Sequence, residues 1–131
     1  RRMLDKYAKS LEVEPEKITF NAMDEALLKR AMAIVEKNMD NIEFSTDEFA
    51  REMNMSRSNL HLKLKAITGE STIDFIRKIR FNEAAKLLKD GRYTVAEVST
   101  MVGFNTPSYF ATSFKKYFGC LPTEYIKKSK G

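Results

Sequence analysis

The chain has 131 residues, of which 43% are hydrophobic, and its 23 Lys and Arg against 18 Asp and Glu give a formal net charge of +5. This length and composition allow one modest domain with a real core. No apolar run approaches the ~18 residues of a membrane span, and no signal-peptide pattern is present. Cys120 is the single cysteine, which excludes an internal disulfide and predicts a reducing, cytoplasmic setting.

The first 23 residues differ in character from the rest of the chain. Leu4, Tyr7 and Leu11 stand at helical spacing, which predicts the end of a helix that packs on something outside this sequence. Residues 12–23 are charged and contain Pro15, as a linker does. The sequence starts at Arg1 and not at a methionine, which predicts a fragment of a longer protein or a processed chain. From the helical spacing and the linker, we expect residues 1–23 to be a helix tail and linker from an upstream domain. An ordinary tail is the alternative.

Residues 24–38 are predicted to form the first helix of the following domain. Asp24 and Glu25 suit the positive end of its dipole. Its buried stripe is predicted to be Leu27, Ala31, Ile34 and Val35. We expect this helix to support the next ones, with Ile42 and Phe44 covering the start of the helix after it.

A first helix-turn-helix is predicted over residues 45–69. Ser45 and Glu48 have the spacing of a capping box at the start of its first helix. Its second helix follows Ser56 and ends at Gly69. The residues expected to face inward from that second helix are Leu60, Leu64 and Ile67.

A long linking helix is predicted over residues 72–89, before Asp90 and Gly91. Its 18 residues would span roughly 27 Å. Apolar residues lie around much of its circumference, which is typical of a helix buried between neighbours. A strut of this length suits two recognition helices held near the ~34 Å that separates successive major grooves.

A second helix-turn-helix is predicted over residues 94–118. Thr94 and Glu97 form another capping box, and Gly103 provides a residue tolerant of positive φ where the chain reverses. Thr106 can cap the next helix, whose first position is Pro107. The side chains expected to face the core are Phe110, Phe114 and Tyr117. A short final helix is predicted over residues 122–128.

The two helix-turn-helix segments are repeats of each other. With an offset of 49, Ser45 aligns with Thr94 and Glu48 with Glu97. After the turn the offset becomes 50, and the similarity continues beyond the glycine that ends each second helix. Core packing alone gives little reason for such a repeat, whereas a function performed by two equivalent helix-turn-helix units would explain it.

The positive charge lies with the repeats. Residues 1–44 carry a net charge of −1, and residues 45–131 carry +6. A surface that binds phosphate groups needs such an excess, although surface lysines also serve solubility.

Residues 24–128 resemble the C-terminal DNA-binding domain of the AraC (arabinose-operon regulator) family. The similar segments are SRSNLHLKLKAITG (56–69), FIRKIRFNEAAKLL (75–88) and VAEVSTMVGFNTPSYFATSFKKYFGCLPTEY (95–125). The resemblance implies an all-α domain over residues 24–131 with about seven helices. In that fold two homeodomain-like helix-turn-helix subdomains are joined by a long central helix, and the two recognition helices read adjacent major grooves of double-stranded promoter DNA.

The segment before this domain resembles family members fused behind a receiver domain, especially bacterial hybrid two-component sensors that control polysaccharide use. The resemblance therefore implies a transcription regulator that is the output domain of a signal-transduction protein. We expect homodimerisation through an upstream region, contact with RNA polymerase, and no membrane contact by this chain. A histidine kinase fused upstream would make the whole protein an enzyme.

Six residues are candidates for base contact. The first recognition helix turns Ser58, His61 and Leu62 outward, and the second presents Ser108 and Thr112 after Asn105 at the turn. Family members often carry an arginine at the positions of Leu62 and Thr112. Without this bidentate guanine reader, we expect greater dependence on phosphate contacts, methyl contacts and DNA shape. Leu62 either contacts a thymine methyl group or is simply exposed, and His61 either donates to DNA or is solvated.

The candidates for phosphate contact are basic residues on or after the recognition helices. They are Arg57, Lys63, Lys65, Arg77, Lys115, Lys116 and Lys127.

No catalytic constellation is visible, since there is one histidine, one cysteine and no glycine-rich phosphate loop. We expect no enzymatic activity, cofactor or metal in this chain. The alternative to a DNA-binding regulator is a helical protein-interaction module that does not bind DNA.

Overall fold

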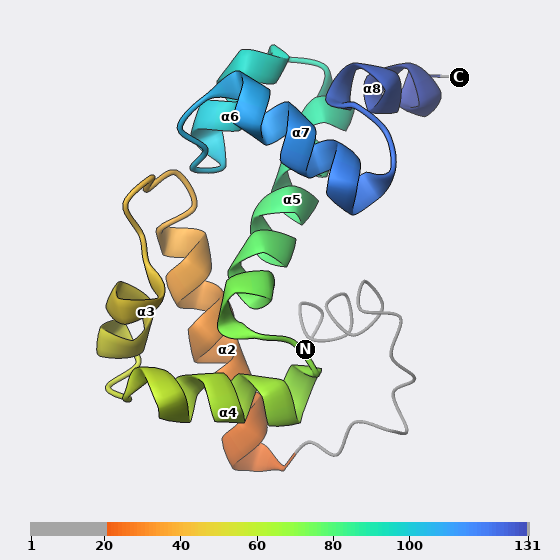
Figure 1. Ribbon diagram of the computed structural model, residues 1–131. Helices are drawn as coiled ribbons and strands as arrows, with labels where there is room; N and C mark the ends of the chain where they lie inside the picture. Colours follow the sequence, from red (N-terminus) through yellow and green to blue (C-terminus); the bar gives the residue numbers. More distant parts are fainter. Residues whose placement is uncertain (1–20, 131) are drawn as a thin grey trace. The chain divides into compact units, whose positions relative to one another are not determined.

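The computed structural model describes residues 21–130, and these residues form seven helices (Figure 1). In chain order the helices are α2 (Ala22–Lys37), α3 (Thr46–Glu52), α4 (Arg57–Thr68), α5 (Thr72–Asp90), α6 (Val95–Met101), α7 (Pro107–Phe118) and α8 (Pro122–Lys130). The all-α prediction is confirmed. The helix expected within residues 1–11 lies outside the described residues.

The chain divides into two compact units. Within residues 21–130, the first comprises residues 21–37 and 45–76, and the second comprises residues 38–44 and 77–130. Among the described residues, the first unit contains α2, α3, α4 and the start of α5, and the second contains the rest of α5 with α6, α7 and α8. Each unit therefore holds one helix-turn-helix, and the long helix α5 runs from one unit into the other.

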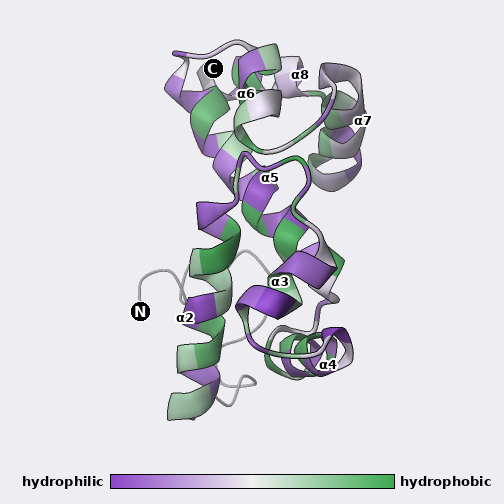
Figure 2. Cartoon of the chain, turned by 90° about the vertical axis from the view of Figure 1, so that its left-hand side faces the viewer, coloured by the Kyte–Doolittle hydropathy of each residue, from purple (hydrophilic) through white to green (hydrophobic). Residues whose placement is uncertain are grey.

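In the first unit, α2 starts earlier and buries a different stripe from the one predicted. The Asn21 side chain accepts a hydrogen bond from the Asp24 N–H at 2.8 Å, so the helix is capped before Ala22. The buried residues of α2 are Leu28, Ala31, Met32 and Val35, whereas Leu27 and Ile34 are half-buried. Figure 2 shows hydrophobic and hydrophilic residues interspersed along α2. The sequence of α2 therefore contains two overlapping sets of apolar residues that could be buried, and tertiary packing buries one of them.

Aromatic stacking closes the core of the first unit. Phe49 of α3 and Phe75 in the first turns of α5 are both fully buried, with ring centroids 6.0 Å apart. Leu60, Leu64 and Ile67 of α4 are buried, as predicted. The start of α5 thus acts as the last helix of this unit.

Phe81 lies at the centre of the core of the second unit. Its ring centroid is 5.0 to 6.4 Å from those of five other rings, which belong to Phe104, Phe110, Phe114, Tyr117 and Phe118. Phe110 and Phe114 are fully buried, as predicted. Tyr117 was expected to face the core, but 36% of it is exposed and one face of its ring stacks on Phe81.

The predicted capping box is complete in only one of the two repeats. The Thr94 hydroxyl accepts from the Glu97 N–H at 3.1 Å, and the Glu97 carboxylate accepts from the Thr94 N–H at 2.8 Å. The Ser45 hydroxyl accepts from the Glu48 N–H at 3.2 Å, but the Glu48 carboxylate pairs with Arg51 instead. The prediction of a second full capping box was therefore wrong, because an arginine one turn away competes for the carboxylate.

Burial along α5 also differs from the prediction, because an apolar residue is exposed and two basic residues are buried. Ile73 was among the apolar residues expected to be covered, yet 55% of it is exposed. Lys78 and Arg80, in contrast, are buried. Ile42 in the loop after α2 is likewise 50% exposed and does not cover the next helix, whereas Phe44 is buried.

A buried arginine holds the turn of the second helix-turn-helix. The Arg80 guanidinium donates to the backbone carbonyls of Asn38 at 3.0 Å and Asn41 at 2.9 Å, and it approaches that of Gly103 at 3.5 Å. Burial lowers the pKa of Arg80, and the Asp40 carboxylate offsets part of that shift. An arginine nevertheless stays protonated in proteins, so the Arg80 guanidinium donates to these carbonyls as a charged group.

Gly103 has no room for a side chain. Its φ is +82°, and a Cβ there would lie 2.7 Å from the Met39 carbonyl oxygen and 2.8 Å from Arg80 Cζ. In the other repeat the corresponding turn residue is Asn54, with a φ of +57°. A left-handed residue thus separates the two helices in both repeats.

We predict that Gly103→Ala destabilises the chain more than Gly91→Ala does. Gly91 has a φ of +77° with nothing near its missing Cβ, so alanine there costs about 1–2 kcal/mol of backbone strain. Alanine at Gly103 adds the displacement of Arg80 or the Met39 carbonyl, for a total above about 3 kcal/mol. Urea unfolding followed by circular dichroism measures both. Equal losses would mean that Arg80 does not fix the turn.

Candidate nucleic-acid interface

Local sequence fixes where the second recognition helix, α7, begins and ends. The Thr106 hydroxyl accepts from the Tyr109 N–H at 3.2 Å, and Pro107 occupies the first helical position. Gly119 ends the helix in the left-handed conformation. Because Phe110 and Phe114 are anchored in the core, the rotation of α7 about its axis is also fixed.

The opposite face of α7 is exposed and polar. Ser108, Thr112, Lys115 and Lys116 are all exposed on it, as the sequence predicted, and Asn105 is exposed in the turn before it. The Thr112 hydroxyl donates to the Ser108 carbonyl at 3.0 Å, which leaves its lone pairs free to accept. Short polar groups therefore occupy the start of the face, and lysines occupy its last turn.

The first recognition helix, α4, has the same design with one apolar exception. Ser58, His61, Lys63 and Lys65 are exposed, as predicted. Leu62 is also outward and 64% exposed. Arg57 forms an ion pair with Asp47 at 3.2 Å, but both side chains are largely exposed, so the pair contributes little and leaves Arg57 accessible.

Two phosphate candidates lie outside the recognition helices. Arg77 is on α5 and Lys127 is on α8, and both are exposed. Their exposure fits contact with a polyanion.

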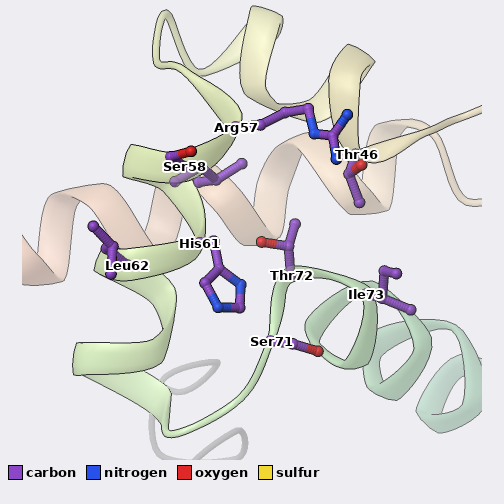
Figure 3. Close-up of a pocket in the computed structure, with 9 residues that line it drawn as sticks. Thr46, Arg57, Ser58, His61, Leu62, Ser71, Thr72 and Ile73 are labelled. Carbon is purple, nitrogen blue, oxygen red and sulfur yellow. The ribbon is translucent and has the colours of Figure 1, made fainter.

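A pocket of about 570 Å³ opens beside α4 in the first unit (Figure 3). It is lined by Thr46, Arg57, Ser58, Leu60, His61, Leu62, Ser71, Thr72 and Ile73. The sequence had indicated Arg57, Ser58, His61 and Leu62 as contact residues, but not Thr46, Ser71, Thr72 or Ile73. The sequence held one signal for Ile73. The repeat aligns it with Thr123, so an aliphatic residue in the first unit stands where the second unit has a polar residue.

Other kinds of site are not visible in the part of the chain that the structure describes. Residues 21–130 contain no group of three or more His, Cys, Asp and Glu side chains that could hold a metal ion. Among the same residues, no helix has the length and apolar character needed to cross a membrane.

Known proteins share both the sequence pattern and the fold. A family model described as a helix-turn-helix domain matches residues 49–128. Over 124 residues the chain is 38% identical to histidine kinase P4 of Formosa agariphila, a match covering 95% of this chain and 9% of that protein. It is 32% identical over 102 residues to the HTH-type transcriptional regulator MtrA of Neisseria gonorrhoeae, covering 76% and 34%. The C-terminal domain of AraT, a response regulator from Geobacillus stearothermophilus, is similar with a TM-score of 0.72 and 30% identity, covering 78% of this chain and 84% of that one.

These matches extend over both repeats, since residues 49–128 run from α3 into α8. The chain spans only 9% and 34% of the length of the two relatives named here, so it corresponds to one part of each. The chain belongs to the AraC-type helix-turn-helix family of DNA-binding transcription regulators.

Proposed function

We propose that this chain is the sequence-specific DNA-binding output domain of a bacterial two-component signalling protein. The observation that carries the proposal is the repeated presentation of a polar helix face. In each unit buried apolar residues fix one side of the recognition helix, and the other side exposes small polar groups and lysines. A helix of this kind is suited to the major groove of double-stranded DNA.

Phosphate contact supplies most of the affinity in this proposal. We assign it to Arg57, Lys63, Lys65, Arg77, Lys115, Lys116 and Lys127, all of which are exposed. Each contact releases counterions from the duplex, so affinity must fall as salt rises. A protein-interaction module without DNA binding would lack this dependence.

We assign sequence reading to Ser58, His61, Leu62, Asn105, Ser108 and Thr112. All six are exposed, and none has the planar fork of an arginine that reads guanine bidentately. Discrimination should therefore come from single hydrogen bonds, apolar contact with thymine methyl groups and the shape of the duplex.

The two-component context is supported by the proteins that this chain resembles. One is named a histidine kinase and another a response regulator. We propose that residues 24–131 are the DNA-binding domain and that residues 1–23 connect it to an upstream receiver domain. Dimerisation through that upstream part, contact with RNA polymerase and location in the cytoplasm complete the proposal. Kinase activity would belong to other domains of the longer protein.

We predict that Lys115→Ala and Lys116→Ala weaken binding to all duplexes alike. Each removes one phosphate contact, so the slope of log affinity against log salt should fall by about 1. Fluorescence anisotropy titrations from low to high salt measure this slope. Lys29→Ala is the control, because Lys29 is an exposed lysine of α2 that pairs with Glu25 at 3.7 Å. A slope unchanged in the two α7 variants would remove these lysines from the interface.

We predict the opposite behaviour for Ser108→Ala and Thr112→Ala. Each should cost about 1–3 kcal/mol on the preferred duplex and relax the preference at one base position, with the salt slope unchanged. Selection from a library of randomised duplexes, repeated with each variant, gives the base preferences. Identical preference profiles for parent and variants would exclude both residues from base reading.

We predict that tethering two copies at Arg1 raises affinity for DNA with two sites but not with one. A flexible tether converts the second binding event into an intramolecular one, which commonly adds ~10²–10⁴ in apparent affinity. Gel shifts on one-site and two-site duplexes test this, with the untethered chain as control. Equal affinity of the tethered form for both duplexes would contradict dimeric action.

A further inference from the structure

The pocket beside α4 has apolar side chains at both ends. Figure 3 shows Leu62 and Ile73 at opposite ends of it, with His61 and Thr72 between them. Leu62 is 64% and Ile73 55% exposed, although both are large aliphatic residues. The other large aliphatic residues of α4, Leu60, Leu64 and Ile67, are buried. Two exposed aliphatic side chains at one pocket are suited to apolar parts of a ligand.

Thr72 provides a hydroxyl group at the pocket. It is only 6% exposed, and no hydrogen bond joins its hydroxyl to any of residues 21–130. The threonines Thr68 and Thr112 instead donate to carbonyls four residues earlier, at 2.7 and 3.0 Å. Thr72 is the first residue of α5, so its helix has no such carbonyl to offer. Among the described residues, the side-chain atoms that are buried without a hydrogen-bond partner are Arg80 Nε and Ser99 Oγ, so the Thr72 hydroxyl is still accessible at the pocket that the residue lines, where a ligand can reach it.

The middle of the pocket is suited to an anion. Arg57 lies at its wall, and His61 and Thr72 point toward the same space between α4 and the start of α5 (Figure 3). These groups offer a guanidinium, a ring N–H and a hydroxyl. A pocket of about 570 Å³ also has room for a nucleotide-sized group.

The second helix-turn-helix lacks this combination. At the offset of 50, Leu62 aligns with Thr112, Ile73 with Thr123 and Thr72 with Pro122. The apolar ends and the central hydroxyl are therefore specific to the first repeat.

We propose that this pocket holds one thymidine nucleotide of the target strand. The phosphate accepts from Thr72 and His61, the thymine methyl group packs on Leu62, and the deoxyribose of the neighbouring nucleotide, on the far side of that phosphate, packs on Ile73. The inference rests on the proposed DNA-binding function and deepens it. It adds Thr72 and Ile73 to the DNA-contact residues, and it means that the first recognition helix recognises a base through apolar contact.

The test uses the duplex that the unmodified chain selects from a randomised library. Each thymine is replaced in turn by uracil, which removes only the methyl group. At one position, uracil should weaken binding by the parent about fourfold, the equivalent of one buried methyl-sized group. Leu62→Thr, which installs the residue of the second repeat, should lose a similar factor and become indifferent to uracil at that position.

The other two contacts have their own variants. Ile73→Thr should weaken binding about fourfold, while Ile42→Thr, at an aliphatic residue of similar exposure outside the pocket, should bind as the parent does. Thr72→Val keeps the shape and removes the hydroxyl, so it should weaken binding about tenfold. A neutral methylphosphonate at the contacted phosphate should abolish that difference.

Thermal melts establish whether each variant folds. If Thr72→Val does not fold, the proposal is tested by Leu62→Thr, because Leu62 is exposed and its variant should lose the sensitivity of binding to uracil. The proposal is overturned if the parent binds the selected duplex but no thymine couples to Leu62, or if Ile73→Thr binds like Ile42→Thr. Either outcome would mean that the pocket does not bind a thymidine nucleotide, and a protein surface would then be the alternative occupant. A parent chain that selects no duplex at all would instead refute the proposed function.

Discussion

The left-handed turn between the two helices of each helix-turn-helix is the constraint on which the rest depends. In the second unit, Gly103 leaves space that the Arg80 guanidinium and the Met39 carbonyl fill. Arg80 in turn ties the loop carbonyls of Asn38 and Asn41 to α5. With this turn fixed, α7 places Phe110 against Phe81, and its polar side is left to solvent. The surface that we propose to contact DNA is therefore set by contacts that lie beneath it.

The sequence predicted the features that depend on neighbouring residues. Caps such as Thr106 and stop signals such as Gly119 act within one turn of helix, so the bounds of α4, α5 and α7 were predicted to within a residue. Periodicity also indicated which residues of the recognition helices are exposed, because Leu60 and Phe110 each begin a buried stripe.

What depends on distant partners was not predictable. Periodicity could not choose between two stripes of α2, and Glu48 had an alternative partner in Arg51. Arg80 is buried because carbonyls 39 and 42 residues away accept from it, which no local pattern indicates. Ile73 reads as one more apolar residue of a buried helix, yet it lies exposed at the mouth of a pocket. Periodicity therefore indicated the exposed side of each recognition helix, but it did not indicate exposure that depends on packing between helices, as at Ile73.

We propose that one chain contacts DNA through both of its helix-turn-helix repeats. Hydroxyl-radical footprinting of the untethered chain on its selected duplex tests this most directly, because it records which sugars the protein covers. We expect two protected segments on one face of the duplex, about 10–10.5 base pairs apart. A single protected segment, unchanged when the surface of α4 or of α7 is altered, would contradict it.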